Sequence, residues 1–248
     1  MGRCAQCDDT GFTIRAIDGV ERAARCACQA ESASHRRLEA ARIPRRYASC
    51  TLEGFVPQSG QEIAKRIAEE FLSDYPLESG SSGLLLLGAP GVGKTHLGVS
   101  VLRTLIIEKG VQGIFYDYGD LLRTIQSTWE RDSPLSESSV LDSVMSAEVL
   151  LLDDLGATRP SLWVQEVLSH VLNSRYNAER VTLLTSNHLD ARTEPGASEG
   201  RQRDVREASL DHQIGTRLRS RLHEMCRTVV MGGADFRQAY KDASFRAR

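Results

Sequence analysis

The sequence predicts an α/β fold in which helices cover a parallel sheet, preceded by a small module built around cysteines. From residue 83 onward, short apolar runs alternate with amphipathic stretches, as they do in parallel sheets whose strands are joined by helices. Four of the six cysteines lie within the first thirty residues. With 248 residues, 41% of them apolar, the chain can bury one large core beside a small appendage.

We expect three segments in chain order. They are a cysteine module at residues 1–30, a basic helix and linker at residues 31–60, and the α/β core at residues 61–248. In the module, Asp18-Gly19 is a hairpin signal between β-compatible runs at 12–17 and 20–24. A short helix is expected over residues 31–43, because Pro44 disfavours helical geometry in the residue before it.

The core elements follow from periodicity. Apolar residues recur at helical spacing from 61 to 74, and Pro76 closes that segment. Five strands are expected, at 84–87, 113–118, 149–152, 181–185 and 228–231, and they predict a five-stranded parallel sheet flanked by helices. Residues 190–206 are polar and lack apolar periodicity, which indicates a surface loop.

Charge and hydropathy limit the possible partners. The longest apolar run, Leu84–Leu87, is far shorter than the ~20 residues of a membrane helix, and residues 1–30 lack the apolar stretch of a signal peptide. We therefore expect a cytoplasmic protein with no membrane partner, whose cysteines are metal ligands or buried side chains. A net charge of -2 restricts DNA contacts to local patches.

Two arginine clusters are candidates for such patches. The first comprises Arg36, Arg37, Arg42, Arg45 and Arg46, and the second comprises Arg217, Arg219, Arg221 and Arg227. A solvated helix face explains either cluster equally simply.

A phosphate-binding loop follows the first core strand. It consists of Gly88, Ala89, Pro90, Gly91, Val92, Gly93, Lys94 and Thr95, which fit G-x-x-x-x-G-K-[ST] between a strand and the helix expected at 95–108. Glycines let successive N–H groups point inward, and the helix start adds partial positive charge. Lys94 would neutralise the β and γ phosphates and Thr95 would ligate Mg²⁺. We include the next residue, His96, among the candidate nucleotide contacts.

Polar side chains end two further strands. The strand at 149–152 runs into Asp153 and Asp154, where Asp153 would hold the Mg²⁺ shell and Asp154 would orient the attacking water. The alternative is the start of a solvated loop. The strand at 181–185 leads to Asn187, which can hydrogen-bond the lytic water or the γ-phosphate, although Thr-Ser-Asn is also an ordinary turn.

These segments resemble the AAA+ ATPases of the DnaC and DnaI type, which load replicative helicase, and the related IstB-type transposition ATPases. The resemblance rests on residues 88–95, 151–156, 173–177, 185–187 and 233–237. It implies ATP as the nucleotide, hydrolysis of that ATP, and a replicative helicase as partner. It also implies that Asp154 replaces the usual catalytic glutamate and that Asn187 is the sensor asparagine.

The same resemblance implies an arginine finger on a late helix, around residues 215–222. Leu210, Ile214, Leu218 and Leu222 form one apolar stripe, with Arg217 and Arg221 on one flank and Arg219 on the other. The Ser-Arg-Leu segment selects Arg221, which would act on a neighbouring subunit and imply a homo-oligomer with ATP. Pairing with nearby acids is the alternative. No helical lid is expected after the sheet.

The cysteines of the module form two pairs, Cys4-x-x-Cys7 and Cys26-x-Cys28, which can close a tetrahedral Zn²⁺ site. The second pair departs from C-x-x-C, so a redox or unliganded module remains open. DnaI-like loaders carry a zinc module at this end that contacts helicase. Cys50 and Cys226 have no partner at metal-ligand spacing and are expected to be buried side chains.

Residues 118–129 correspond to a helix that touches single-stranded DNA in the resembling family. Arg123, Gln126 and Trp129 offer a charge, an amide and a stacking face, although Trp129 is also suited to the core. Two other functions remain open. One is a transposition helper ATPase that binds duplex DNA, and the other is a small-molecule phosphotransferase, which the sensor-like Asn187 and the arginine helix disfavour.

Overall fold

The computed structural model describes residues 4–17, 20–76, 83–130, 134–158, 161–189 and 209–237. The predicted Asp18-Gly19 turn and the predicted loop at 190–206 lie outside these ranges. Of the helices within them, none has the length and apolar character needed to cross a membrane.

A five-stranded parallel sheet forms the centre of the core, which confirms the predicted fold class. The strands are β3 (Gly83–Gly88), β4 (Gly113–Asp117), β5 (Val149–Asp153), β6 (Val181–Ser186) and β7 (Cys226–Met231), in the spatial order β4-β5-β6-β3-β7. Successive residues of β3 serve opposite faces, with Leu84 and Leu86 in one hydrophobic cluster and Leu85 and Leu87 in the other. Burial on both faces explains why these strands are continuous apolar runs.

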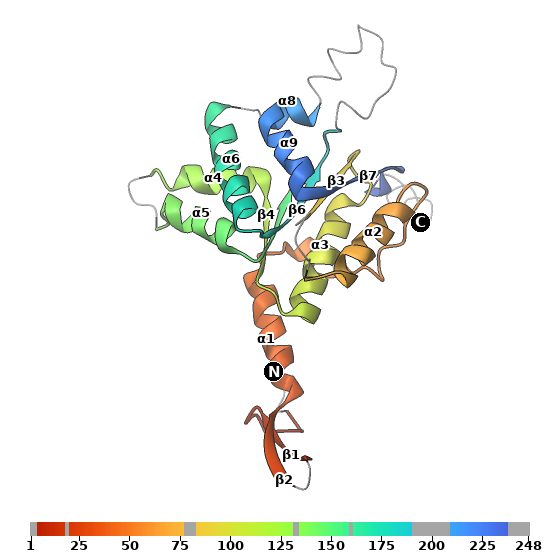
Figure 1. The fold of residues 1–248 in the computed structure, drawn as a ribbon, viewed down its shortest axis with the longest axis vertical. Helices are drawn as coiled ribbons and strands as arrows, with labels where there is room; N and C mark the ends of the chain where they lie inside the picture. The colour runs from red at the N-terminus through yellow and green to blue at the C-terminus, as the bar shows by residue number, and fades with distance from the viewer. Residues whose placement is uncertain are drawn as a thin grey trace, which may run out of the picture.

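Helices cover both faces of the sheet (Figure 1). On one side lie α2 (Glu62–Ser73) and α3 (Lys94–Thr104), and a π-helical turn, η2 (Leu105–Lys109), continues α3. On the other side lie α4 (Tyr118–Ser127), α5 (Glu137–Ser146), α6 (Leu162–Asn177), α8 (Leu210–Ile214) and α9 (Thr216–Met225). All parallel strands therefore end at one edge, where α3 and α4 begin.

The predicted late apolar stripe is buried, since Leu210, Ile214, Leu218 and Leu222 all belong to the core. The helix that carries it is not continuous, however. Gly215 has φ 86° and ψ 148°, outside the helical region, and separates α8 from α9. A glycine adopts this conformation without the steric cost that another residue would bear, which explains the break.

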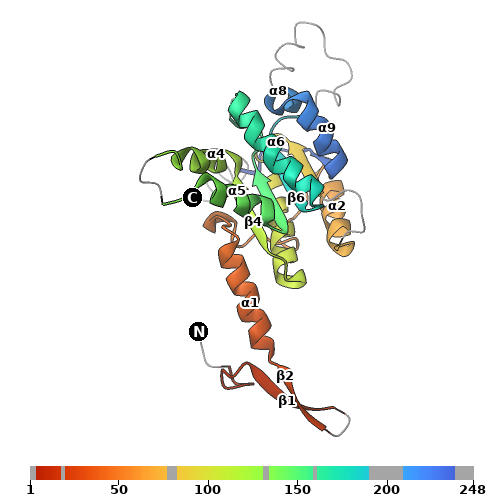
Figure 2. The same ribbon diagram turned by 60° about the vertical axis from the view of Figure 1, so that its left-hand side comes forward.

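The N-terminal segment forms an arm that projects from the core (Figures 1 and 2). Its far end is the predicted hairpin, with β1 (Phe12–Ile17) antiparallel to β2 (Val20–Arg25). Helix α1 (Ala27–Ala40) leads back to the core and continues into a 3-10 turn, η1 (Arg45–Tyr47). The helix differs from the predicted span of 31–43, because it begins directly after Cys26 and ends before Arg42, whose φ is 58°. The predicted division at residue 30 thus falls inside a helix.

Candidate active site

The phosphate-binding loop connects the end of β3 to the start of α3, as predicted. Gly93 precedes the helix with φ 88°, and a Cβ there would lie 2.9 Å from the Phe55 ring. Glycine is therefore required both by backbone conformation and by close packing. Lys94, the first residue of α3, is only 6% exposed. The loop thus presents its backbone and one buried ammonium group at the carboxyl edge of the sheet.

Lys94 links the loop to the end of β6. Its Nζ donates to Gly88 O at 2.9 Å, to Ala89 O at 2.8 Å and to Asn187 Oδ1 at 2.7 Å. Burial lowers the pKa of Lys94, while the charges of Asp154 and Asp153 act in the opposite direction. The structure therefore brings together Lys94 and Asn187, which are ninety-three positions apart in the sequence.

Asp153 lies at the end of β5 and is buried. Its Oδ1 accepts hydrogen bonds from Thr95 Oγ1 at 2.8 Å and from Thr185 Oγ1 at 2.6 Å. Burial raises the pKa of Asp153, against the opposing effect of these two hydrogen bonds. Neighbouring ligands of octahedral Mg²⁺ lie about 3 Å apart, so the Thr95 hydroxyl and the Asp153 carboxylate fit one Mg²⁺ ion.

Asp154 is half-buried and has a left-handed backbone, with φ 59°. Its N–H donates to Thr185 Oγ1 at 2.9 Å, and its Oδ1 accepts a hydrogen bond from Asn187 Nδ2. A non-glycine residue in this conformation is uncommon, and such strain clusters at functional sites. Asn187 thus bridges Lys94 and Asp154 through the two ends of its amide.

Two segments beside the loop were not given a role by sequence reasoning. Phe236 N donates to Gly91 O at 3.2 Å, and a Cβ on Gly91 would lie 1.9 Å from Asp235 Oδ1. The nearby Arg237 guanidinium contributes to lowering the pKa of Lys94. The motif at 233–237 was the available signal, but only the fold shows that it packs against the phosphate loop.

The other segment approaches the start of α3 from the linker. The His96 ring lies edge-on to Phe55 with 5.5 Å between ring centroids, and His96 Nε2 is 3.4 Å from Thr51 O. His96 thus contacts the linker, and Phe55 closes the loop from outside.

Arg221 lies on α9 against α6. Its Nη1 donates to Asn173 Oδ1 at 2.9 Å, and its guanidinium carbon is 4.7 Å from the centroid of the Tyr176 ring. Tyr176 OH in turn donates to Glu224. Among the described residues, no carboxylate lies within 4.0 Å of the Arg221 guanidinium. Within the described ranges, these contacts do not include the alternative, an ion pair between Arg221 and a nearby acid.

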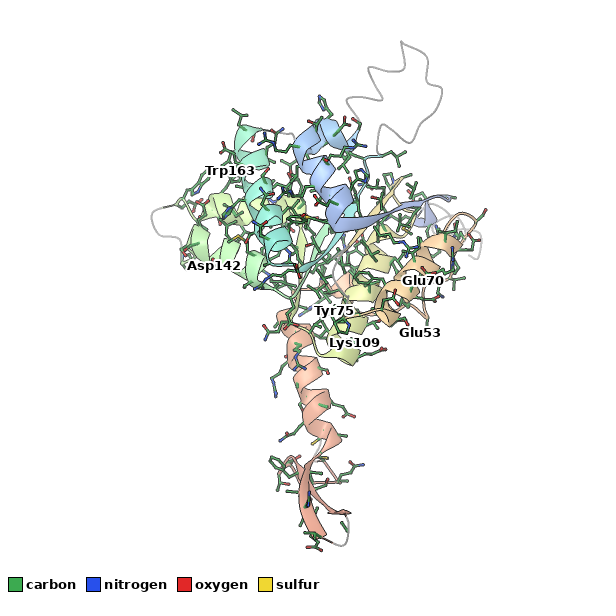
Figure 3. All side chains as sticks on the ribbon, in the orientation of Figure 1. Glu53, Glu70, Tyr75, Lys109, Asp142 and Trp163 are labelled. Atoms are coloured by element: carbon green, nitrogen blue, oxygen red, sulfur yellow. The ribbon has the colours of Figure 1, made fainter. Side chains whose placement is uncertain are left out.

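Two of the three candidate DNA contacts around α4, Arg123 and Trp129, contact neighbouring side chains. Arg123 forms an ion pair with Asp120, and Trp129 Nε1 donates to Glu137 Oε2 at 3.2 Å. Trp129 is 58% exposed and meets Trp163 edge-on, with 5.3 Å between ring centroids. Figure 3 labels Trp163 near the start of α6. Of the two interpretations of Trp129, a core position is excluded, because its ring lies at the surface.

The four module cysteines form one cluster, in which all sulfur atoms lie within 4.8 Å of one another. Cys4 Sγ and Cys26 Sγ are 3.8 Å apart, and Cys7 Sγ and Cys28 Sγ are 3.4 Å apart. Ligands at the Zn–S distance of about 2.3 Å on a tetrahedron are separated by about 3.8 Å, so the cluster fits Zn²⁺. The fold provides this geometry because the hairpin returns the chain and α1 begins at the second pair.

Electrostatics within the cluster favour ionisation of one sulfur. Burial disfavours the Cys7 thiolate, but the Gly11 N–H and the neighbouring thiols outweigh it and lower the pKa of Cys7 to about 7. Hydrogen bonding to Cys7 raises the pKa of Cys28. Cys50 and Cys226 are 5% and 3% exposed, which confirms the expectation that they are buried side chains.

Comparison with known proteins agrees with the site. The family model described as IstB-like ATP binding protein matches residues 22–195, more than half of the chain. The chain belongs to this family. Its core is an AAA+ ATPase domain, as predicted, and the crystal structure of the DnaC helicase loader superposes with a TM-score of 0.63. That structure is 29% identical to this chain, of which it covers 76%, and this chain covers 100% of it.

Two curated relatives show how far the similarity extends. The replicative helicase loader DnaC of Buchnera aphidicola is 27% identical over 151 residues, which is 59% of this chain and 58% of that protein. Protein XkdC of the phage-like element PBSX in Bacillus subtilis is 28% identical over 245 residues, 94% of this chain and 84% of that protein. The chain spans about three fifths of the length of the DnaC relatives that it matches.

Proposed function

We propose that this chain hydrolyses ATP with Mg²⁺ and loads a replicative DNA helicase onto single-stranded DNA. The observation that carries the ATPase part is the convergence of Lys94, Asp153, Asp154 and Asn187 at one edge of the sheet. The loader part rests on similarity to proteins named replicative helicase loader DnaC.

Each of these side chains has a separate role in the proposed transfer of the γ-phosphoryl group to water. Backbone N–H groups of residues 91–93 and the Lys94 ammonium hold the β and γ phosphates. Thr95 and Asp153 would hold Mg²⁺, which neutralises charge on the β and γ oxygens. Asp154 orients the attacking water. Asn187 hydrogen-bonds both Lys94 and Asp154, and its amide would hydrogen-bond the γ-phosphate or the attacking water.

Arg221 is proposed to complete the site of a neighbouring subunit. Asn173 and Tyr176 hold its guanidinium with a neutral amide and an aromatic ring, and within the described part of the chain no carboxylate pairs with it. Such a charge can offset the negative charge that develops on a γ-phosphate in the transition state. Hydrolysis would then depend on assembly of a homo-oligomer with ATP bound.

The arm is proposed to carry one structural Zn²⁺ on Cys4, Cys7, Cys26 and Cys28 and to bind the helicase. Metal ligation would supply most of the folding free energy, because a hairpin of this size has almost no core. Phe12 and Ile14 lie on one face of the hairpin and are 52% and 72% exposed, so this face offers apolar side chains to a partner. ATP binding in the core would control subunit assembly, and hydrolysis would release the loader.

An IstB-type transposition helper that binds duplex DNA is the second candidate, because the matching family model is described as IstB-like ATP binding protein. Stimulation of ATP hydrolysis separates the two. A loader responds to its host's replicative helicase, whereas a transposition helper responds to duplex DNA, and a phosphotransferase would respond to a small acceptor. Lys94→Ala is the background control and should lose nucleotide binding, because only backbone donors remain.

Deletion of residues 1–45 tests the division of labour. The shortened chain should no longer capture the helicase in a pull-down, while its nucleotide affinity should be nearly unchanged. An unaltered helicase interaction would assign the arm to another partner and strengthen the transposition candidate.

A further inference from the structure

A cavity lies at the base of the arm, at the edge of the sheet opposite the nucleotide site. Its volume is about 450 Å³, within the range of about 300–1,000 Å³ that is typical of ligand pockets. Residues of α1, of the start of β4 and of the end of α5 line it. Gly113, which begins β4, lines this cavity, whereas the candidate active site gathers where the strands end. A ligand here would leave the phosphate loop accessible.

Two arginines of α1, Arg36 and Arg37, line the cavity together with Ser143 and Ser146. A third, Arg42, lies next to it. The Arg42 guanidinium carbon is 4.4 Å from the centroid of the Tyr116 ring, and the Tyr116 hydroxyl is 3.5 Å from Ser143 Oγ. The wall of the cavity thus combines cationic side chains with serine side chains.

The positive charge around this cavity is not compensated. Within the described part of the chain, none of the five arginines between residues 36 and 46 has a carboxylate within 4.0 Å. The one acid among them, Glu39, lies 3.3 Å from His35. Other exposed arginines are paired, such as Arg66 and Arg227, both with Glu70.

The nearby acids do not change this picture. Asp142 lies on α5 (Figure 3), and Glu108 and Glu148 lie in the adjoining segments, all of them exposed. In the described ranges, none of the three forms an ion pair with an arginine of the arm.

Phosphate groups fit this combination of donors. Guanidinium groups match phosphate geometry and remain charged at all physiological pH values. Several arginines close together in the sequence suit the regular charges of a polynucleotide backbone. The cavity lies between α1 and α5, so a flexible single strand can bring its phosphates to Arg36 and Arg37.

We propose that the cavity lined by Arg36 and Arg37, with Arg42 beside it, binds phosphates of single-stranded DNA independently of the nucleotide site. It is a DNA contact on the arm and at the opposite edge of the core from α4. DNA bound here would lie between the cysteine hairpin and the ATPase core.

Binding of a fluorescent oligothymidylate to the full-length, metal-containing chain tests this, with anisotropy measured over a salt series. The variant is Arg36→Ala/Arg37→Ala, and the matched control is Arg66→Ala, an exposed arginine that is paired with Glu70. Each lost phosphate contact lowers the slope of log K against log salt by about 0.7, so the double variant should lose about 1.4 from the slope and bind about tenfold more weakly. The control should bind as the unmodified chain does.

Further variants and ligands make the outcome unambiguous. Arg36→Lys/Arg37→Lys should regain most of the salt slope, and unchanged ATP binding shows that the alanine variant is folded. Unchanged affinity of the alanine variant would overturn the proposal, as would loss of DNA binding only in Arg123→Ala. Tighter binding of a duplex than of the oligothymidylate would overturn the assignment of single-stranded DNA as the ligand. If polyglutamate binds through these arginines and oligothymidylate does not, the cavity serves an acidic protein segment instead.

Discussion

Arg175 is a buried guanidinium that no carboxylate accompanies in the described ranges, and replacing it by methionine tests how the core is held together. Its side chain is fully buried between α5, α6 and the start of β6. Nη1 donates to Val144 O and to Ala147 O, both at 2.8 Å, and Nε donates to Thr182 Oγ1 at 3.0 Å. Nη2 donates to Val181 O. The guanidinium therefore joins the end of α5 to the start of β6.

Arg175→Met keeps an unbranched side chain but removes every one of these donors. Each buried acceptor left without a partner costs about 1–3 kcal/mol. Burial lowers the pKa of Arg175 to about 9, so the native group is charged at neutral pH and its desolvation already reduces stability. Relief of that cost offsets part of the loss. With three carbonyl acceptors affected, we expect a net loss of about 2–5 kcal/mol in the free energy of unfolding.

Urea unfolding followed by circular dichroism measures this loss. The matched control is Arg66→Met, which removes an exposed pair with Glu70 and should cost less than about 0.5 kcal/mol. Equal stability of Arg175→Met and the unmodified chain would refute the reasoning, since it would mean that the carbonyls find water or other donors when the guanidinium is removed.

Three further predictions concern the proposed chemistry. Asp154→Asn should bind fluorescent ATP normally but release phosphate at least about 100-fold more slowly, and turnover at the native rate would remove Asp154 from the mechanism. Anaerobically purified protein should contain one zinc per chain, and Cys26→Ser should retain it less well. Zinc should be lost as pH falls, because the thiolates reprotonate. Absence of zinc in a metal analysis would favour the redox or unliganded module. Tyr176→Leu should leave ATP affinity unchanged and slow assembly-dependent hydrolysis about threefold, whereas Tyr176→Phe keeps the ring beside Arg221 and should not. Equal rates in both Tyr176 variants would show that the ring does not position Arg221.

The order of elements was predictable from the sequence because buried parallel strands are apolar throughout and phosphate loops have fixed spacing. All five core strands were located to within a few residues of their observed bounds, as was α2. Helix boundaries were less predictable where local conformation departs from periodicity. Arg42 ends α1 early with a positive φ, and Gly215 divides the late helix, although neither residue disturbs the apolar spacing around it.

Contacts between segments that are distant in the sequence could not be predicted from the sequence alone. The residues that border the phosphate loop come from the linker, from the end of β6 and from the segment after β7, and only the strand order brings them to one edge. Thr185 illustrates this limit, because an isolated threonine in an apolar strand gives no sign that its hydroxyl will contact both Asp153 and the Asp154 backbone.

Arg175 within the motif at 173–177, and Arg221 which contacts that motif, show how burial separates a structural role from a chemical one. Arg175 lies inside the core and donates hydrogen bonds from all three of its nitrogens. Its donors therefore hold α5 to β6. Arg221 is half-buried and donates one hydrogen bond to a described residue, Asn173, while the Tyr176 ring supports its planar face. A guanidinium has five N–H donors, and among the described residues most of those on Arg221 have no acceptor. The same stretch of α6 therefore anchors the core from one side and presents a positioned cation from the other, which is the property that a residue acting across a subunit interface requires.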